Sequence, residues 1–330
     1  MSVVRFTSED LVRPRFAVSP VRETVSSWGV HRGADRSAHH RTWTTAATRA
    51  AGRASFAEHA ALLDVFVRPD AWPPDFLTPL PGTAAPDLAA DLEAELAAVA
   101  ATPPDVVRAT VLATQRPQRP TGLARAVAED PDTWLPRLVE AVRDWHRLVI
   151  APSWGRMHTV LEADIAYRTD VLAEHGPGRM FTSIDNSLTW AGEVLRVEDG
   201  ADLDVHLTGT GLPLLPGLFL THGPVPTVRP GSPPLLVYRA RAAGALWARR
   251  RRPPADVGLG ALLGPSRAGV LAVLETPDTT TAVATRLGLG APSVNAHLKV
   301  LTAAGLTSRH RHGREVFYVL TDLGRRLLRR

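Results

Sequence analysis

Cysteine is absent from this sequence of 330 residues. The chain therefore has no disulfide scaffold, no thiolate zinc site, no iron–sulfur cluster and no cysteine nucleophile. Because disulfides mark oxidising compartments, we expect a location in the reducing cytoplasm. Lysine is almost missing too, since Lys299 is the one lysine among 38 basic residues. The excess of arginine is typical of a GC-rich coding sequence, so an arginine cluster counts for less here than in an average protein.

Long apolar runs are also missing. Arginine, aspartate or proline interrupts every stretch before it reaches the roughly 20 residues needed to cross a bilayer, so no membrane partner is expected. Residues 1–16 carry five charged side chains where a signal peptide needs apolar ones. At 45% hydrophobic and 22% charged residues, the composition is that of a globular protein, and the length suits two or three domains.

Charge is distributed unevenly along the chain. Residues 1–260 carry 28 basic and 29 acidic side chains, a net charge of −1, whereas residues 261–330 carry ten basic and four acidic ones, a net charge of +6. The formal charge of +5 thus lies in the last fifth of the sequence. A basic small domain joined to a neutral body indicates a polyanionic partner for that domain alone.

The sequence divides into four segments. The pattern of residues 1–178 predicts mainly helices, and we expect them to form a regulatory or dimerisation domain. Residues 179–248 are predicted to form a small antiparallel β region of the same body. Its strands are expected over 188–198, 203–208, 214–221 and 235–240. Residues 249–258 begin with four arginines and two prolines, which predicts a surface linker. Residues 259–330 form a separate domain. We therefore expect an α+β fold.

The last seventy residues contain a recognisable order of elements. Helices are predicted over 266–274, 280–287 and 292–304, with a Gly-Leu-Gly turn between the second and third. Strands over 306–310 and 316–320 flank a hairpin tip, and a last amphipathic helix covers 321–329. This order is that of a winged helix-turn-helix domain.

Three separate segments of this domain resemble the ArsR/SmtB winged-helix repressors. Residues 287–289, 294–306 and 313–318 read Leu-Gly-Leu, Val-Asn-Ala-His-Leu-Lys-Val-Leu-Thr-Ala-Ala-Gly-Leu and Gly-Arg-Glu-Val-Phe-Tyr. The resemblance covers about residues 261–328 and implies DNA binding. Family members often carry arginine where this chain has Ala296, so this chain lacks that guanine-reading side chain. The metal sites of the family do not carry over, because residues 279–287 and 321–330 contain neither cysteine nor histidine.

The resemblance also bears on assembly and on the body. In the family, dimers form through the first and last helices of the domain, which correspond here to 266–274 and 321–329. More loosely, the body resembles a domain of unknown function found ahead of such helices in actinobacterial regulators. The segments that carry this second resemblance are 10–16 with 19–20, 74–77, and 209–219 with 237–238. It implies no chemistry.

The helix predicted over 292–304 has two distinct faces. At 100° per residue, Val294, Leu298 and Leu301 project together and form a buried stripe. The opposite face carries small or polar residues, namely Pro292, Ala296, Lys299 and Ala303, flanked by Ser293 and Asn295. Small side chains fit the floor of a major groove, where Asn295 is suited to read an adenine edge.

Other residues of this domain are expected to contact DNA less specifically. His297 projects nearer the buried stripe, so packing or a phosphate contact is favoured over base reading. Arginines surround the hairpin tip, in the wing 309–316, where they suit the minor groove or the backbone. The full set of predicted DNA-contacting residues is Thr280, Thr281, Pro292, Ser293, Asn295, Ala296, His297, Lys299, Arg309, Arg311, His312 and Arg314.

The body offers no catalytic or cofactor signature, and no enzyme activity, cofactor or metal is predicted. Asp202, Asp204 and His206 would share one face of a strand, but at about 3.3 Å per residue the outer two lie roughly 13 Å apart, too far to hold one ion. The sequence 209–211 lacks the third glycine and the following helix of a dinucleotide fingerprint. The tryptophans are expected mainly in the core, and the size of the body leaves room for an effector pocket or a dimerisation surface.

Together these observations predict a sequence-specific, double-stranded-DNA-binding transcriptional regulator. A homodimer would present two recognition helices, 292–304, to major-groove half-sites about one helical turn apart, with each wing on the minor groove or the backbone. Repression is the simpler expectation, because a bound operator blocks polymerase. An unidentified small-molecule or protein effector, bound by the N-terminal body, would regulate binding.

Two alternatives stay open at this point. One is an enzyme body with an appended DNA-binding tether, against which the lack of a catalytic constellation argues. The other is a winged helix used for protein docking, against which the charge of +6 argues. Salt-dependent affinity for duplex DNA separates DNA binding from docking.

Overall fold

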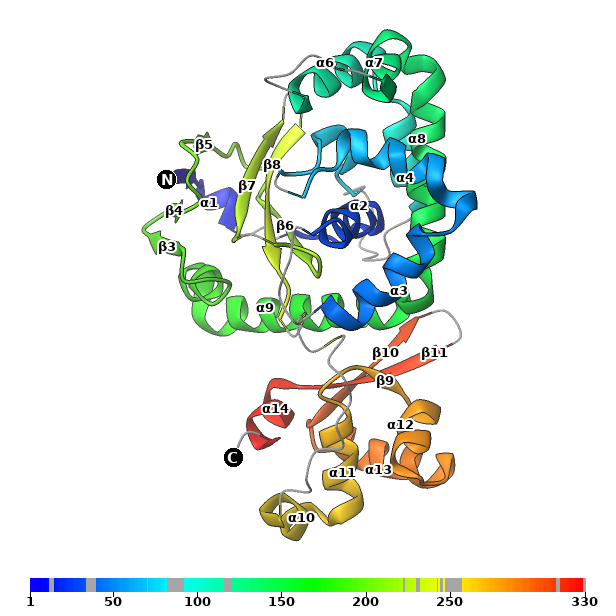
Figure 1. Cartoon of the computed structure of the whole chain (residues 1–330). Helices are drawn as coiled ribbons and strands as arrows, with labels where there is room; N and C mark the ends of the chain where they lie inside the picture. Colours follow the sequence, from blue (N-terminus) through cyan, green and yellow to red (C-terminus); the bar gives the residue numbers. More distant parts are fainter. Residues whose placement is uncertain are drawn as a thin grey trace. The chain divides into compact units, whose positions relative to one another are not determined.

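The chain combines helices with small sheets in a computed structural model (Figure 1). The described residues are 1–11, 15–33, 40–69, 71–81, 92–115, 120, 122–221, 223–229, 232–241, 243, 246, 257–312 and 315–328. They form two compact units: Met1–Pro152 with Val171–Arg239, and Ser153–Asp170 with Ala240–Arg330. Of the predicted linker, residues 249–256 lie outside the described residues. The fold is thus mixed α and β, as the sequence predicts.

Helices make up most of the first unit. They are the short α1 (Ser8–Leu11), α2 (Pro20–His31), α3 (Arg41–Ala51), α4 (Ala57–Phe66), α5 (Leu92–Ala100), α6 (Pro104–Thr114), α7 (Gly122–Glu129) and α8 (Pro131–Trp145). Short 3₁₀ turns cover Ala54–Phe56, Asp75–Leu77 and Ala151–Ser153, and a π-helical turn covers His146–Ile150. Two N-termini follow capping signals in the sequence. The Thr7 hydroxyl donates to Asp10 Oδ2 at 2.7 Å, and the Ser19 hydroxyl accepts the Arg22 amide at 3.0 Å.

In the described part of the chain, no single helix has both the length and the apolar composition to cross a bilayer. Helices α5 and α6 reach them only when taken together, across a bend of 89°. Leu96 and Val99 of α5, and Val107 and Val111 of α6, are buried inside the protein.

The long helix α9 (Trp154–Thr182) contributes to both units. Its residues up to Asp170 belong to the second unit, which nothing in the sequence predicts, and the rest belongs to the first. At Gly176 the backbone leaves the helix, with φ 76° and ψ 177°, and Pro177 follows. Only glycine adopts these angles without strain, so this glycine fixes the break. The break lies two residues before the boundary predicted at residue 178, and the compact units divide after Pro152, Asp170 and Arg239.

Two four-stranded sheets complete the first unit. The first sheet contains β1 (Ser2–Arg5), β3 (Leu188–Ala191), β4 (Val194–Val197) and β5 (Asp204–His206), in the order β3-β4-β1-β5. The second contains β2 (Arg15–Phe16), β6 (Pro213–Gly217), β7 (Val225–Arg229) and β8 (Ser232–Arg239), in the order β2-β6-β8-β7. The predicted strands are therefore present, but the sheets are mixed and not purely antiparallel as predicted: β4 runs antiparallel to β1 and β3, and β7 runs antiparallel to β8. Strand β1 runs parallel to β5, and β6 runs parallel to β2 and β8. Side-chain alternation defines the faces of a strand but not the direction of its neighbour.

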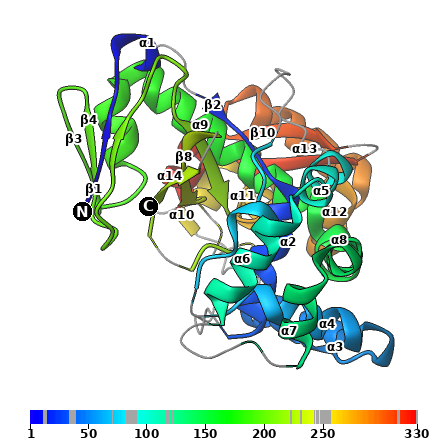
Figure 2. The same ribbon diagram turned by 90° about the horizontal axis from the view of Figure 1, so that it is seen from above.

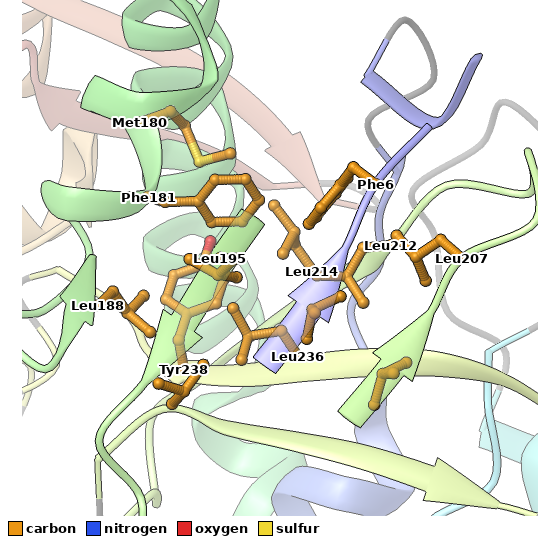
Figure 3. Packing of buried hydrophobic residues seen from close by; sticks show 13 residues of the cluster. Phe6, Met180, Phe181, Leu188, Leu195, Leu207, Leu212, Leu214, Leu236 and Tyr238 are labelled. Atoms are coloured by element: carbon orange, nitrogen blue, oxygen red, sulfur yellow. The ribbon is translucent and has the colours of Figure 1, made fainter. Parts of the chain in front are cut away.

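Strands β1 and β2 also come from the segment predicted to be helical, and they tie the N-terminus into the core (Figure 3). Phe6, directly after β1, packs edge-on against Phe181 at the end of α9, with 5.7 Å between ring centroids. Leu214 and Tyr238 of the second sheet belong to the same buried cluster. The break at Gly176 therefore lets the end of α9 cover residues from both sheets.

A buried carboxyl group, Glu23 of α2, lies in the first unit. Its two oxygens each accept the backbone amide of Leu218 at 3.1 Å. Burial raises the pKa of Glu23 to about 8, against the opposing effect of hydrogen bonds from Leu218 and Phe219 and of the Arg22 charge. Between pH 4.5 and about 8, the folded protein therefore keeps a proton on Glu23 that the unfolded chain releases.

We expect Glu23→Gln to change the pH dependence of stability. Above pH 4.5 the unfolded chain releases the proton that the folded chain retains, so the free energy of unfolding of the native protein falls as the pH rises toward 8. The variant has no carboxyl at this position, so its free energy of unfolding should not show this fall. Relative to the native protein it should increase by up to about 1.4 kcal/mol per pH unit. Urea unfolding at pH 5 and pH 8 measures the gain. An unchanged difference between the two proteins would show that Glu23 does not titrate in this range.

The second unit follows the predicted order of elements closely. Besides the first part of α9 it contains α10 (Val257–Leu263), α11 (Pro265–Val273), β9 (Asp278–Thr279), α12 (Thr280–Leu287), α13 (Ala291–Ala303), β10 (Thr307–His312), β11 (Glu315–Leu320) and α14 (Asp322–Leu328). The antiparallel sheet has the order β10-β11-β9. Side chains of α11, α12 and α13 pack with Tyr318 and Leu320 of β11 in one core. Helix α10 and strand β9 were not expected from the sequence.

Helix α14 is held against the chain by a close backbone approach. Thr321 donates its amide to the Leu306 carbonyl at 3.1 Å, and a Cβ on Gly324 would lie under 3.0 Å from that same carbonyl oxygen. Since a backbone oxygen cannot move aside cheaply, we expect Gly324→Ala to lower the free energy of unfolding by about 1–3 kcal/mol. The matched control is Gly260→Ala in α10, where a Cβ meets nothing within 4 Å. Equal denaturation midpoints for the two variants would contradict this account.

Candidate nucleic-acid interface

Helices α12 and α13 are joined by a tight turn. Thr279 caps α12, its hydroxyl accepting the Ala282 amide at 3.3 Å, and Gly288 ends the helix with a left-handed φ of 67°. Pro292 occupies the first turn of α13, where its missing amide would have no partner anyway. Seen from two directions, α12 and α13 lie on the side of the unit away from α10 and α14 (Figures 1 and 2).

Helix α13 has the two faces that the sequence predicts. Val294, Leu298 and Leu301 are buried, with at most 1% of each exposed, and pack in the core of the unit. The exposed residues of this helix and of its turn include Pro292, Ser293, Ala296, Lys299, Val300 and Ala303. Apart from Val300, this outward surface consists of small side chains and one cation.

Asn295 and His297 lie at the edges of that outward surface, and both are half-buried. Nε2 of His297 lies 3.5 Å from the hydroxyl of Ser293, one turn earlier in the helix. At the start of α12, Thr281 is exposed and Thr280 is half-buried. The structure thus brings the predicted residues of α12 and α13 onto neighbouring helices that are joined by a single turn.

The hairpin of β10 and β11 places its arginines on one face. Arg309 lies opposite Tyr318, and Arg311 lies opposite Val316, in the antiparallel register. Cross-strand partners share a face, and Tyr318 packs into the helical core, so both arginines belong to the face that carries the helices. Arg309 and Arg311 are exposed. The predicted residue Arg314 and the side chain of His312 lie outside the described residues.

The cations of the second unit differ in how they are neutralised. Arg286 is bound to the buried Asp278 at 2.9 Å, and Arg326 is bound to Asp322 at 3.1 Å. Lys299 and Arg309, by contrast, have no acidic partner among the residues that the structure describes. Their charges are therefore available to an anion from solution.

The opposite face of β10 meets the first part of α9, a contact that the sequence did not predict. Oε2 of Glu162 lies 3.5 Å from Nδ1 of His158, one turn away on α9, and 3.5 Å from Nδ1 of His310 on β10. Burial of Glu162 opposes its ionisation, but the two imidazoles outweigh burial and lower the pKa of Glu162 to about 2. The sequence holds one sign of this cluster, the spacing of four residues between His158 and Glu162, which places both on one face of a helix. That spacing does not indicate which distant residue packs against them.

The candidate residues of the body do not assemble into a site. Asp204 and His206 are exposed on β5, where Asp204 is paired with Arg5 at 3.0 Å. Trp28 and Trp145 are buried against each other, with 4.7 Å between ring centroids. Within the described ranges, no group of three or more His, Asp or Glu side chains could hold a metal ion.

The arrangement of the second unit is chemically simple. It offers an exposed helix face of small side chains, a half-buried amide at its edge, and two cations without acidic neighbours among the described residues. Exposed cations beside small side chains are suited to a polyanionic ligand. Among known proteins, no family model, no curated protein and no solved structure matches this chain.

Proposed function

We propose that the second unit is a winged helix-turn-helix domain and that the protein is a sequence-specific, duplex-DNA-binding transcriptional regulator. The observation that carries this proposal is the outward surface of α13, which has small side chains and Lys299, together with the exposed Arg309 of β10. The order of three helices, a hairpin and a last helix supports it. So does the net charge of +6 on residues 261–330.

The roles of the residues follow from groove chemistry. Ala296 and Ala303 allow α13 to approach the floor of the major groove and to meet thymine methyl groups. Asn295 reads an adenine edge through its amide, while Ser293 and Thr281 contact phosphate or sugar. Lys299 neutralises a phosphate, and Arg309 and Arg311 bind the backbone or the minor groove beside it.

Assembly and regulation extend the same proposal. Two chains pair through the domain's first and last helices, α11 and α14, of which α14 lies on the side away from α12 (Figure 2). The pair binds half-sites about one helical turn apart and represses by covering the operator. The first unit responds to an effector, which shifts the population between arrangements that fit DNA and those that do not.

Selection from a library of random duplexes with the full-length protein tests this function. We expect enrichment of an inverted repeat whose half-sites are about 10–10.5 base pairs apart. On the selected site, Asn295→Ala should lose about 1–3 kcal/mol of binding free energy and should lose little on random duplexes. No enrichment would contradict sequence-specific binding, and equal losses on both kinds of duplex would remove Asn295 from base reading.

A further inference from the structure

A pocket of ≈ 220 Å³ lies inside the second unit, between the first part of α9 and the segment from β10 to α14. Val160, Ala163 and Leu320 form an apolar wall, and Tyr167 and Asp170 of α9 form a polar end. Sites for drug-sized ligands occupy roughly 300–1,000 Å³. The pocket therefore suits a smaller molecule.

One cation of the chain already lies at this pocket. Cζ of Arg241 is 3.4 Å from the centre of the Tyr167 ring, and its Nη2 donates to Oδ1 of Asp322 at 3.1 Å. The backbone amide of Arg241 donates to Asp164 at 2.9 Å. An aromatic face with a carboxylate beside it is the environment that stabilises a flat organic cation. The Arg241 guanidinium thus shows that this part of the pocket accommodates a flat cation.

Three carboxylates line the pocket, those of Asp164, Asp170 and Asp322, against two arginines, Arg241 and Arg325. Asp322 is bound by Arg241 and Arg326, and the buried Asp164 is accompanied by Arg168 at 3.6 Å. Asp170, one turn after Tyr167 on α9, is exposed and has no ion-pair partner among the residues that the structure describes. One carboxylate at the pocket is therefore open to a cation from solution.

We propose that this pocket binds a small organic cation with an apolar or aromatic body. An ammonium or amidinium group pairs with Asp170, and the body lies against Val160, Ala163 and Leu320, next to the Tyr167 ring. An anion is disfavoured, because the three carboxylates of the lining outnumber its two arginines. The position of Asp170 on the rim leaves room for the charged end of the ligand to keep part of its hydration.

The site also offers a route to regulation, which rests on the proposed DNA binding. Ser308 and His310 of β10 line the pocket and alternate along the strand with Arg309. A bound molecule therefore touches one face of the strand that presents Arg309 on its other face. Ligand binding itself does not depend on DNA, so the two claims fail separately.

Calorimetric titration of the full-length protein tests the site, with benzamidine as the probe. We expect saturable binding of benzamidine and none of benzoate, which has the same size and the opposite charge. Asp170→Asn should weaken benzamidine binding about tenfold or more, because the variant loses a charged hydrogen bond. Glu275→Gln, an exposed carboxylate outside the pocket, is the matched control and should bind like the native protein.

Three results would overturn the proposal: no binding of benzamidine, equal binding of benzoate, or an unchanged affinity after Asp170→Asn. A second titration, of the selected duplex with and without saturating benzamidine, tests the regulatory consequence. A changed duplex affinity supports it and an unchanged one refutes it, whereas loss of all duplex binding would refute the proposed function and leave the calorimetric result standing.

Discussion

Replacing Lys299 and Arg309 together with alanine is expected to weaken binding to the selected duplex about a hundredfold or more. Neither charge is neutralised by an acidic neighbour among the described residues, so each is free to make a charged contact with phosphate. A hydrogen bond to a charged group contributes about 1.5–3 kcal/mol, which is about tenfold or more in affinity for each residue. The loss should also appear on random duplexes, because phosphate carries no sequence information.

Fluorescence anisotropy with labelled duplexes measures this loss. The matched control removes two arginines elsewhere, Arg137→Ala with Arg147→Ala, whose side chains are exposed and already paired with Glu58 and Asp144. The control changes the net charge of the protein by the same amount. Equal weakening in both double variants would mean that overall charge, and not the surface of α13 and β10, determines affinity.

The second large effect concerns the core beneath that surface. We expect Leu298→Ala to lower the free energy of unfolding of the second unit by about 2–5 kcal/mol, because the Leu298 side chain is fully buried and its removal leaves a cavity between α13 and the rest of the unit. Val300→Ala, two residues later on the same helix, is the matched control. Val300 is 47% exposed, so its truncation should cost little.

Hydrogen exchange of the amides of α13 reports this loss in the full-length protein, because it separates the second unit from the first. Faster exchange in Leu298→Ala and native-like exchange in Val300→Ala is the expected pair of results. If both variants exchanged alike, α13 would not be anchored by the predicted stripe. The outward orientation of Asn295 and Lys299, which follows from burial of that stripe, would then be unsupported.

The elements of the second unit could be predicted because their signals are local. Gly288 supplies the left-handed residue that ends α12, Thr279 supplies the cap that starts it, and Pro292 marks the first turn of α13. The apolar period of Val294, Leu298 and Leu301 then fixes which face of α13 is buried. These residues lie within about two turns of what they determine, so the sequence carries the information in one place.

The contacts between distant segments could not be predicted in the same way. The parallel pairing of β1 with β5 joins residues about 200 positions apart, and nothing in either strand specifies the other. Likewise, His310 meets Glu162, and Arg241 covers Tyr167, only because the first part of α9 packs into the second unit. Helical periodicity shows that α9 has an apolar face but does not show what covers it. The pocket beside Tyr167 was missed for this reason.

The salt dependence of binding to the selected duplex tests the central claim most directly. In a titration of the full-length protein at increasing salt, four to eight phosphate contacts predict a slope of the logarithm of affinity against the logarithm of salt of roughly −4 to −7. Lys299→Ala with Arg309→Ala should reduce the magnitude of that slope by about two. A protein that binds no duplex even at the lowest salt, or binds it with a slope near zero, would contradict the assignment of this surface to DNA.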